Sequence, residues 1–251
     1  PFSLINALED RKLRNYWASS GATSLLPKFV DDMEMKMEYF DHCFIEGDTL
    51  ETSDVVNGGA ELFLYQSGYL TIKGYDDGVY ILGFPNFEVR KALYSVVVPA
   101  LTMKSNSEVV SAQSFLRKMM QDGNTAEAKK ALKALIADVP YSNKKMASMD
   151  MEERYRLIMS TIFRALGFRV EVERMLATGR IDMIVEVPTI IYVLELKLSN
   201  NGGISAAESQ IKEKSYTEPF KADKRKVIAL AVELDETGKG LIDWKEVDES
   251  L

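Results

Sequence analysis

The sequence predicts an α+β region followed by an α/β region whose elements run α-β-β-β-α-β. Two patterns support this: apolar residues at helical spacing interrupted by one short hairpin, and later a series of apolar strands flanked by helices. A polar break at residues 140–148 separates the two patterns. With 251 residues, two compact domains are the expectation. We therefore expect a helical, hairpin-containing region at 1–95, a helical linker at 96–147 and an α/β domain at 148–251.

In the first region, helices are expected over Phe2–Trp17, Leu25–Tyr39 and Glu61–Gln66, strands over Tyr69–Lys73 and Val79–Leu82, and a helix from Asn86 to Val97. Helices followed by a hairpin are typical of a winged-helix-like unit. The linker contains an Ala/Lys-rich helix over Ala126–Ala137, whose lysines are expected to face solvent. A winged helix would serve either as a DNA reader or as an internal lid. The acidic pair Asp76-Asp77 at the hairpin tip favours the lid.

In the second region, a helix is expected from Asp150 to Gly167, strands over Phe168–Val172, Ile181–Val187 and Ile190–Leu198, a helix over Ser205–Tyr216, and strands over Val227–Glu233 and Leu241–Trp244. Gly167 is suited to the left-handed conformation that ends a helix. Pro188-Thr189 separates the second and third strands and predicts a tight hairpin.

Composition excludes several classes of function. Lys and Arg number 31 against 38 Asp and Glu, a net charge of −7 that argues mildly against a general nucleic-acid binder. The chain has one cysteine, Cys43, and one histidine, His42, so it contains neither an internal disulfide nor a structural zinc site. A catalytic triad would have to use His42 itself. Apolar runs are too short to cross a membrane, and a cytoplasmic location is expected.

The hairpin register brings charged residues together. If Val187 pairs with Ile190, then Asp182 faces Glu195, and Lys197 points to the same side two residues further on. The reverse face is apolar from Ile181 to Val187 in one strand and from Tyr192 to Leu198 in the other. Two carboxylates and one ammonium group are therefore expected at one end of a sheet.

Carboxylates facing each other across a strand pair repel, which a bound divalent cation would relieve. Mg²⁺ or Mn²⁺ held by Asp182 and Glu195 would polarise a phosphate and activate a water. Lys197 would orient that water or stabilise developing charge. The alternative is a structural ion-pair cluster in which Lys197 simply neutralises both acids.

Gly179-Arg-Ile-Asp182 and Tyr192-Val-Leu-Glu195-Leu-Lys197-Leu198, in an α-β-β-β-α-β setting, resemble the core motif of the PD-(D/E)XK nuclease superfamily, which has a restriction-endonuclease-like fold. More narrowly, the chain resembles bacterial AAA-ATPase-like proteins that end in such a domain. This resemblance rests on Phe2–Trp17, Tyr65–Lys73, Leu82–Asn86, Gln210–Tyr216 and Glu218–Phe220.

The resemblance implies that Asp182 and Glu195 hold the metal and that Lys197 is catalytic. It also implies that Glu153 is an accessory acid and that Gln210 faces the site. Glu153 has an alternative role in a capping box with Asp150. Relatives place a tyrosine four residues after the glutamine, where this chain has Lys214. Tyr216 is therefore not assigned a role.

The expected function is a Mg²⁺-dependent nuclease that acts on nucleic acid, with DNA as the expected substrate, next to an upstream ATPase module. A local excess of three basic residues in 210–226 would favour phosphate contacts, although a solvated helix face explains it equally. The chain lacks a phosphate-binding glycine loop, so we expect no ATP site in it and regard it as the C-terminal part of a longer protein. The alternatives are a catalytically silent binding platform and a regulatory winged-helix module.

Overall fold

The computed structural model describes residues 9, 39–52, 58–102, 104–137 and 149–248. The chain divides into two compact units, residues 1–100 and 101–251. Apart from Glu9 and Tyr39, the helices expected over Phe2–Trp17 and Leu25–Tyr39 lie outside the described residues.

The first unit contains a small antiparallel sheet with strand order β1-β3-β2. Its elements are η1 (Tyr39–Asp41), β1 (Cys43–Glu46), α3 (Gly47–Glu51), α4 (Gly59–Gln66), β2 (Thr71–Asp76), β3 (Val79–Gly83) and α5 (Phe87–Thr102). The expected hairpin is formed by β2 and β3. Strand β1 was not predicted, because its four residues are too few for an alternation pattern, and pairing with β3 defines it.

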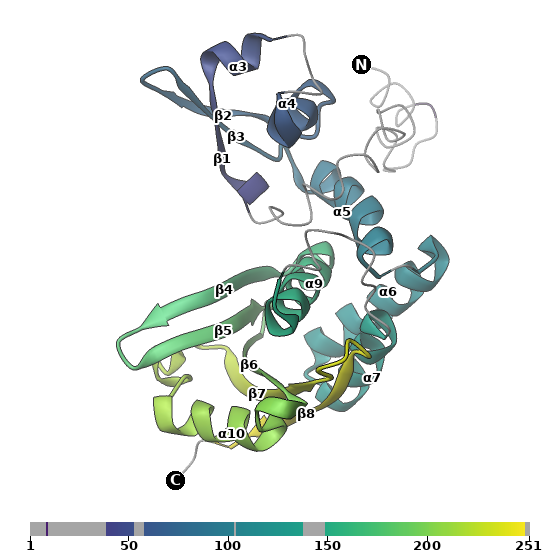
Figure 1. Cartoon of the computed structure of the whole chain (residues 1–251), viewed down its shortest axis with the longest axis vertical. Helices are drawn as coiled ribbons and strands as arrows, with labels where there is room; N and C mark the ends of the chain where they lie inside the picture. The colour runs from purple at the N-terminus through teal and green to yellow at the C-terminus, as the bar shows by residue number, and fades with distance from the viewer. Residues whose placement is uncertain (1–8, 10–38, 53–57, 103, 138–148, 249–251) are drawn as a thin grey trace. The chain divides into compact units, whose positions relative to one another are not determined.

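The second unit is built on a five-stranded sheet with order β4-β5-β6-β7-β8 (Figure 1). Its elements are α6 (Asn106–Asp122), α7 (Thr125–Ile136), α9 (Met151–Ala165), β4 (Arg169–Leu176), β5 (Gly179–Glu186), β6 (Ile190–Leu198), η2 (Ser199–Asn201), α10 (Gly203–Lys214), η3 (Glu218–Phe220), β7 (Lys226–Leu234) and β8 (Leu241–Val247). The β6–β7 pair is parallel and the other neighbours are antiparallel. From α9 to β7 the order is the predicted α-β-β-β-α-β.

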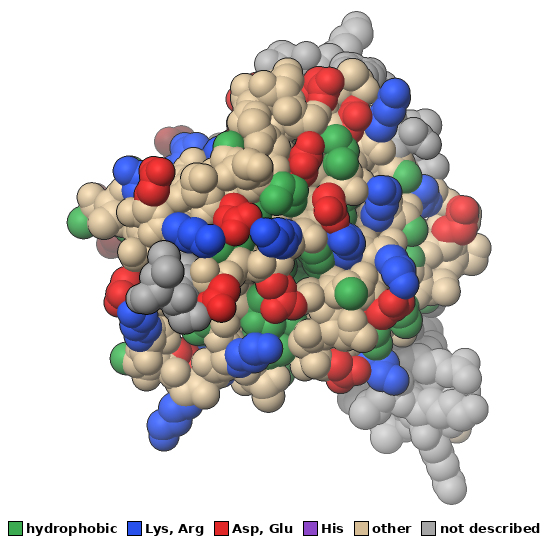
Figure 2. Space-filling model, turned by 90° about the horizontal axis from the view of Figure 1, so that it is seen from below, with side chains coloured by type: hydrophobic (Ala, Val, Ile, Leu, Met, Phe, Trp, Pro, Cys, Tyr) green, Lys and Arg blue, Asp and Glu red, His purple; other side chains and the backbone are tan. Residues whose placement is uncertain are grey.

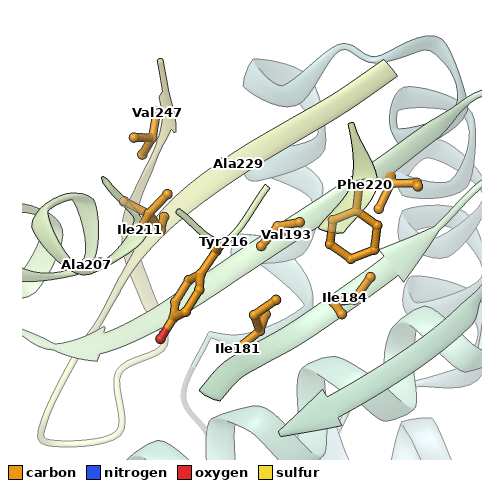
Figure 3. Packing of buried hydrophobic residues seen from close by; sticks show 11 residues of the cluster. Ile181, Ile184, Val193, Ala207, Ile211, Tyr216, Phe220, Ala229 and Val247 are labelled. Atoms are coloured by element: carbon orange, nitrogen blue, oxygen red, sulfur yellow. The ribbon is translucent and has the colours of Figure 1, made fainter. Parts of the chain in front are cut away.

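Helices cover both faces of this sheet. On one face, Ile191 and Val193 of β6 belong to a buried cluster with Ala207 and Ile211 of α10 (Figure 3). On the other face, the hydroxyl of Tyr192 donates a hydrogen bond to the carbonyl of Met120 in α6. Because adjacent strand residues point to opposite faces, α6 and α10 lie on opposite sides of the sheet. The near-continuous apolar sequence of β6 follows from burial on both faces.

The sequence predicted one apolar face for the β5–β6 hairpin, whereas helices pack against both faces of the sheet. Ile181 was expected on the reverse face, but it joins the α10-side cluster together with Ile184. Tyr216 and Phe220, which follow α10, complete this cluster (Figure 3). The end of the sheet that carries the acidic residues is thus enclosed rather than exposed.

The helices expected in the linker are part of the second unit. The Trp244 indole Nε1 donates to the carbonyl of Thr125 at 2.9 Å, and Lys129 Nζ lies 2.6 Å from Asp243 Oδ1. These contacts attach α7 to β8, so the helical hairpin of α6 and α7 covers one side of the sheet. No helix in the described part of the chain is long and apolar enough to span a membrane.

Candidate functional site

The register of the β5–β6 hairpin is the predicted one. Val187 N donates to the carbonyl of Ile190, and the strand pairs run from Glu186–Ile191 to Met183–Leu194. Asp182 and Glu195 are the next residues beyond this last pair. The predicted register is confirmed as far as Met183–Leu194, and the same register continued by one residue would place Asp182 opposite Glu195.

Asp182 is 3% exposed and its carboxylate is held on both sides. Oδ2 accepts a hydrogen bond of 2.9 Å from the backbone N–H of Leu196. Oδ1 lies 3.9 Å from Nη1 of Arg156, a residue of α9. The carboxylate orientation is thus fixed by the neighbouring strand and by the helix above it.

Glu195 is fully buried, and only one of its two carboxylate oxygens accepts a hydrogen bond. Its Oε1 accepts a hydrogen bond of 2.7 Å from Lys197 Nζ, whereas Oε2 has no hydrogen-bond partner among the residues that the structure describes. Burial, followed by the charge of Asp182, raises the pKa of Glu195 to about 8, against the opposing effect of Lys197. A buried carboxylate oxygen without a partner is costly, so this atom marks a place for a ligand.

Lys197 is one-fifth exposed and lies at the solvent side of the two acids. Burial lowers its pKa, but the hydrogen bond to Glu195 and the charges of Glu195, Asp182 and Glu152 outweigh burial and raise the pKa overall. The ammonium group therefore stays charged at neutral pH.

A third acid whose charge interacts with these residues is Glu152, the residue before the predicted Glu153. Burial and the charge of Asp182 raise the pKa of Glu152, while Lys197 and Arg156 lower it. The backbone N–H of Glu153 donates to the side chain of Asp150, which caps the start of α9. A one-residue difference rotates a helical side chain by about 100°, and the docking of α9 decides which glutamate faces the strands.

Gln210 is linked to strand β5, near Asp182, by hydrogen bonds that pass through the Tyr216 hydroxyl. Its Nε2 donates to the Tyr216 hydroxyl at 3.0 Å, and that hydroxyl donates to the carbonyl of Arg180 at 2.7 Å. The charges of Glu195 and Asp182 contribute to a raised pKa for Tyr216, after burial and against the Gln210 hydrogen bond. Tyr216, which the sequence left unassigned, thus ties α10 to β5 two residues before Asp182.

Half of the six cations in the basic stretch at 210–226 form ion pairs. Three of its cations form ion pairs: Lys212 with Glu208, Lys221 with Glu218, and Arg225 with both Asp223 and Glu186. Seen from below, the side on which α10 lies in Figure 1, basic and acidic side chains alternate over the surface (Figure 2). These ion pairs reduce the positive charge that this stretch can offer to phosphate groups.

The acidic residues fit a hard divalent cation. The charge of Asp182 acts on Glu195, and Oε2 of Glu195 accepts no hydrogen bond from the residues that the structure describes. Across the described ranges, no group of three or more His, Cys, Asp and Glu side chains is arranged to hold a metal. A two-carboxylate set suits Mg²⁺, which commonly takes one or two protein carboxylates and completes its shell with water and phosphate oxygens.

The second unit is a mixed α/β domain whose elements from α9 to β7 are consistent with a restriction-endonuclease-like core. Residues 150–244 match the family model described as the PD-(D/E)XK nuclease superfamily, so this segment is a domain of that superfamily. All of the chain is also similar, at 25% identity, to an uncharacterized protein encoded in the vnfD 5′ region of Azotobacter chroococcum mcd 1. The alignment covers 49% of that relative, so the chain spans about half its length. No solved structure matches the chain.

Proposed function

We propose that this protein hydrolyses phosphodiester bonds of nucleic acid, with DNA as the substrate, and that it depends on Mg²⁺ or Mn²⁺. The observation that carries the proposal is the buried, unpartnered Oε2 of Glu195 beside Asp182, within a domain of the nuclease superfamily. A structural ion-pair cluster usually satisfies its buried carboxylate oxygens, so the Oε2 atom that accepts no hydrogen bond supports a metal-binding role.

Each residue has a distinct role in this proposal. Asp182 and Glu195 would hold the cation, which when bound supplies positive charge to the phosphate and lowers the pKa of a nearby water. Lys197 donates to Glu195 and keeps its charge, so it is placed to orient water or stabilise negative charge on the phosphate. Glu152 is the accessory acid in place of Glu153, and Gln210 supports β5 through Tyr216.

The test compares metal binding and cleavage in three variants of the chain. Asp182→Asn and Glu195→Gln should lose Mn²⁺ binding in calorimetry and lose cleavage of labelled DNA. Lys197→Ala should retain Mn²⁺ binding while its cleavage rate falls about 10²–10³-fold, the usual cost of losing one preorganised charge. All three variants should remain folded.

Lys212→Ala is a suitable control, because it removes a lysine of α10 that pairs with Glu208. Its metal binding and cleavage should match the unaltered chain. Absence of both metal binding and cleavage from the unaltered chain would refute the proposal. Metal binding without cleavage of any DNA or RNA offered would favour the silent binding platform.

We also propose that the complete protein couples this domain to an ATPase module. The support is the resemblance described above, together with a relative about twice as long as this chain. The test is whether ATP hydrolysis by the complete protein rises when DNA is added.

A further inference from the structure

A second charged cluster adjoins the acids, on the side of β4. Val172 pairs with Met183 and Arg174 pairs with Ile181, so Glu173 lies opposite Asp182 in the sheet. Glu173 has a φ of 53°, in the left-handed region that residues other than glycine rarely adopt. The backbone is therefore in a costly conformation at the strand position next to the proposed site.

The Glu173 carboxylate lies between two arginines. Its Oε1 is 2.7 Å from Nη1 of Arg180 and 3.2 Å from Nη2 of Arg156. The same Arg156 guanidinium approaches Asp182, with Nη1 at 3.9 Å from Oδ1. One guanidinium thus connects the acidic site to the Glu173–Arg180 pair.

Two guanidinium groups around one anionic oxygen suit a phosphate as well as a carboxylate, because arginine binds both through the same planar donors. The side chains of Glu173 and Arg180 are 41% and 48% exposed, whereas Arg156 is 12% exposed. An anionic ligand from solution can therefore reach Arg180 and displace the Glu173 carboxylate. It would then also contact the less exposed Arg156 guanidinium.

We propose that Arg156 and Arg180 form a binding site for a backbone phosphate adjacent to the one that is cut, and that Glu173 occupies this site in the free protein. This inference rests on the proposed nuclease function, and it deepens that function by assigning a second phosphate contact. It implies that the substrate is a polynucleotide with at least one phosphate next to the scissile bond. Glu173 acts as an internal competitor that a nucleic acid must displace.

The experiment measures binding of a labelled oligonucleotide to the intact chain by fluorescence anisotropy, in EDTA to prevent cleavage and over a range of salt concentrations. Glu173→Gln should bind roughly fivefold more tightly, as expected for removing one unit charge at about 4 Å in water. Arg180→Ala should bind roughly tenfold more weakly, through loss of a charged hydrogen bond. Its slope of log affinity against log salt should fall by about one.

Glu171→Gln is the matched control. Glu171 lies on the same strand, is 40% exposed and pairs with Arg174 at 3.6 Å, so the change in net charge is identical. Its affinity should stay within roughly twofold of the unaltered chain, because solvent-exposed charges away from the ligand are screened. Thermal melts establish that the variants are folded.

Equal tightening by Glu171→Gln and Glu173→Gln would reveal a general charge effect and overturn the second phosphate site. Unchanged affinity and salt slope in Arg180→Ala would overturn it as well. In both cases binding and cleavage by the unaltered chain leave the nuclease proposal intact. An unaltered chain that neither binds nor cuts nucleic acid overturns both proposals.

Discussion

Single residues determine the electrostatics of the site, and Glu195 has the largest consequence. Its carboxylate is buried next to Asp182, and its pKa is raised to about 8. A carboxyl group with a raised pKa in the folded state contributes stability below its ordinary pKa of 4.5, and this contribution is lost as the pH rises towards 8.

We therefore predict that, in EDTA, the melting temperature falls between about pH 5 and pH 8 more steeply in the unaltered chain than in Glu195→Gln. The measurement is thermal unfolding by circular dichroism over this pH range. Ca²⁺ added in excess over the EDTA should reduce the fall in the unaltered chain, because a bound cation offsets the buried charge. Parallel pH profiles for the two proteins would contradict the assignment of this effect to Glu195.

A second prediction at this scale separates two neighbouring glutamates. Glu152→Gln should lower the cleavage rate about 10–100-fold, the usual cost of losing a group that supports metal ligands. Glu153→Gln should leave the rate unchanged, because the N-terminal cap of α9 uses the backbone N–H of Glu153. Single-turnover cleavage of one labelled substrate compares them, and the reverse order of effects would restore the sequence prediction.

At the scale of elements, two tyrosines fasten helices to the sheet from opposite sides. Tyr216 connects α10 to β5 through the carbonyl of Arg180, and Tyr192 connects β6 to α6 through the carbonyl of Met120. Each tyrosine hydroxyl donates one hydrogen bond to a backbone carbonyl, and this bond joins a helix or the segment after it to a strand. Only the Tyr216 bond lies near the charged residues.

Tyr216→Phe and Tyr192→Phe should each lower the free energy of unfolding by about 1 kcal/mol, the net value of one hydrogen bond. Urea denaturation measures this loss. Only Tyr216→Phe should also slow cleavage, because its hydroxyl holds β5 two residues before Asp182. Equal cleavage rates in the two variants would limit Tyr216 to a structural role.

At the scale of the whole molecule, the second unit is larger than the segment that matches the nuclease superfamily. The helical pair α6 and α7 covers Tyr192 and Trp244 on one face of the sheet. A fragment of residues 148–251 would expose this face, whereas residues 101–251 would keep it covered. Large exposed apolar patches promote aggregation.

We predict that residues 101–251 give a cooperative thermal transition and a monodisperse profile in size-exclusion chromatography, and that residues 148–251 aggregate or melt without cooperativity. The comparison uses equal concentrations of both fragments. Equal melting temperatures for the two fragments would mean that α6 and α7 are dispensable for the sheet.

The sequence by itself determined the order of elements from α9 to β7 and the register of the β5–β6 hairpin, which ends one residue before Asp182 and Glu195. These features are local: strand alternation has a period of two, and the Pro188-Thr189 turn fixes the register of one hairpin. The position of Lys197 beside Glu195 follows from the same alternation.

Only the tertiary structure decided features that depend on how distant elements dock. The docking of α9 against the sheet brought Glu152 close enough to Asp182 for their charges to interact, and the return of the chain after α10 brought Tyr216 to Gln210. Helices packed on both faces of the sheet bury Asp182 and Glu195, and Oε2 of Glu195 accepts no hydrogen bond from the described residues. The pairing of β4 with β5 placed Glu173 and its two arginines beside Asp182. The contacts of α9 with β4 and β5 join elements that pack without being fixed by a turn, and no periodicity along the sequence encodes the distance between two packed elements.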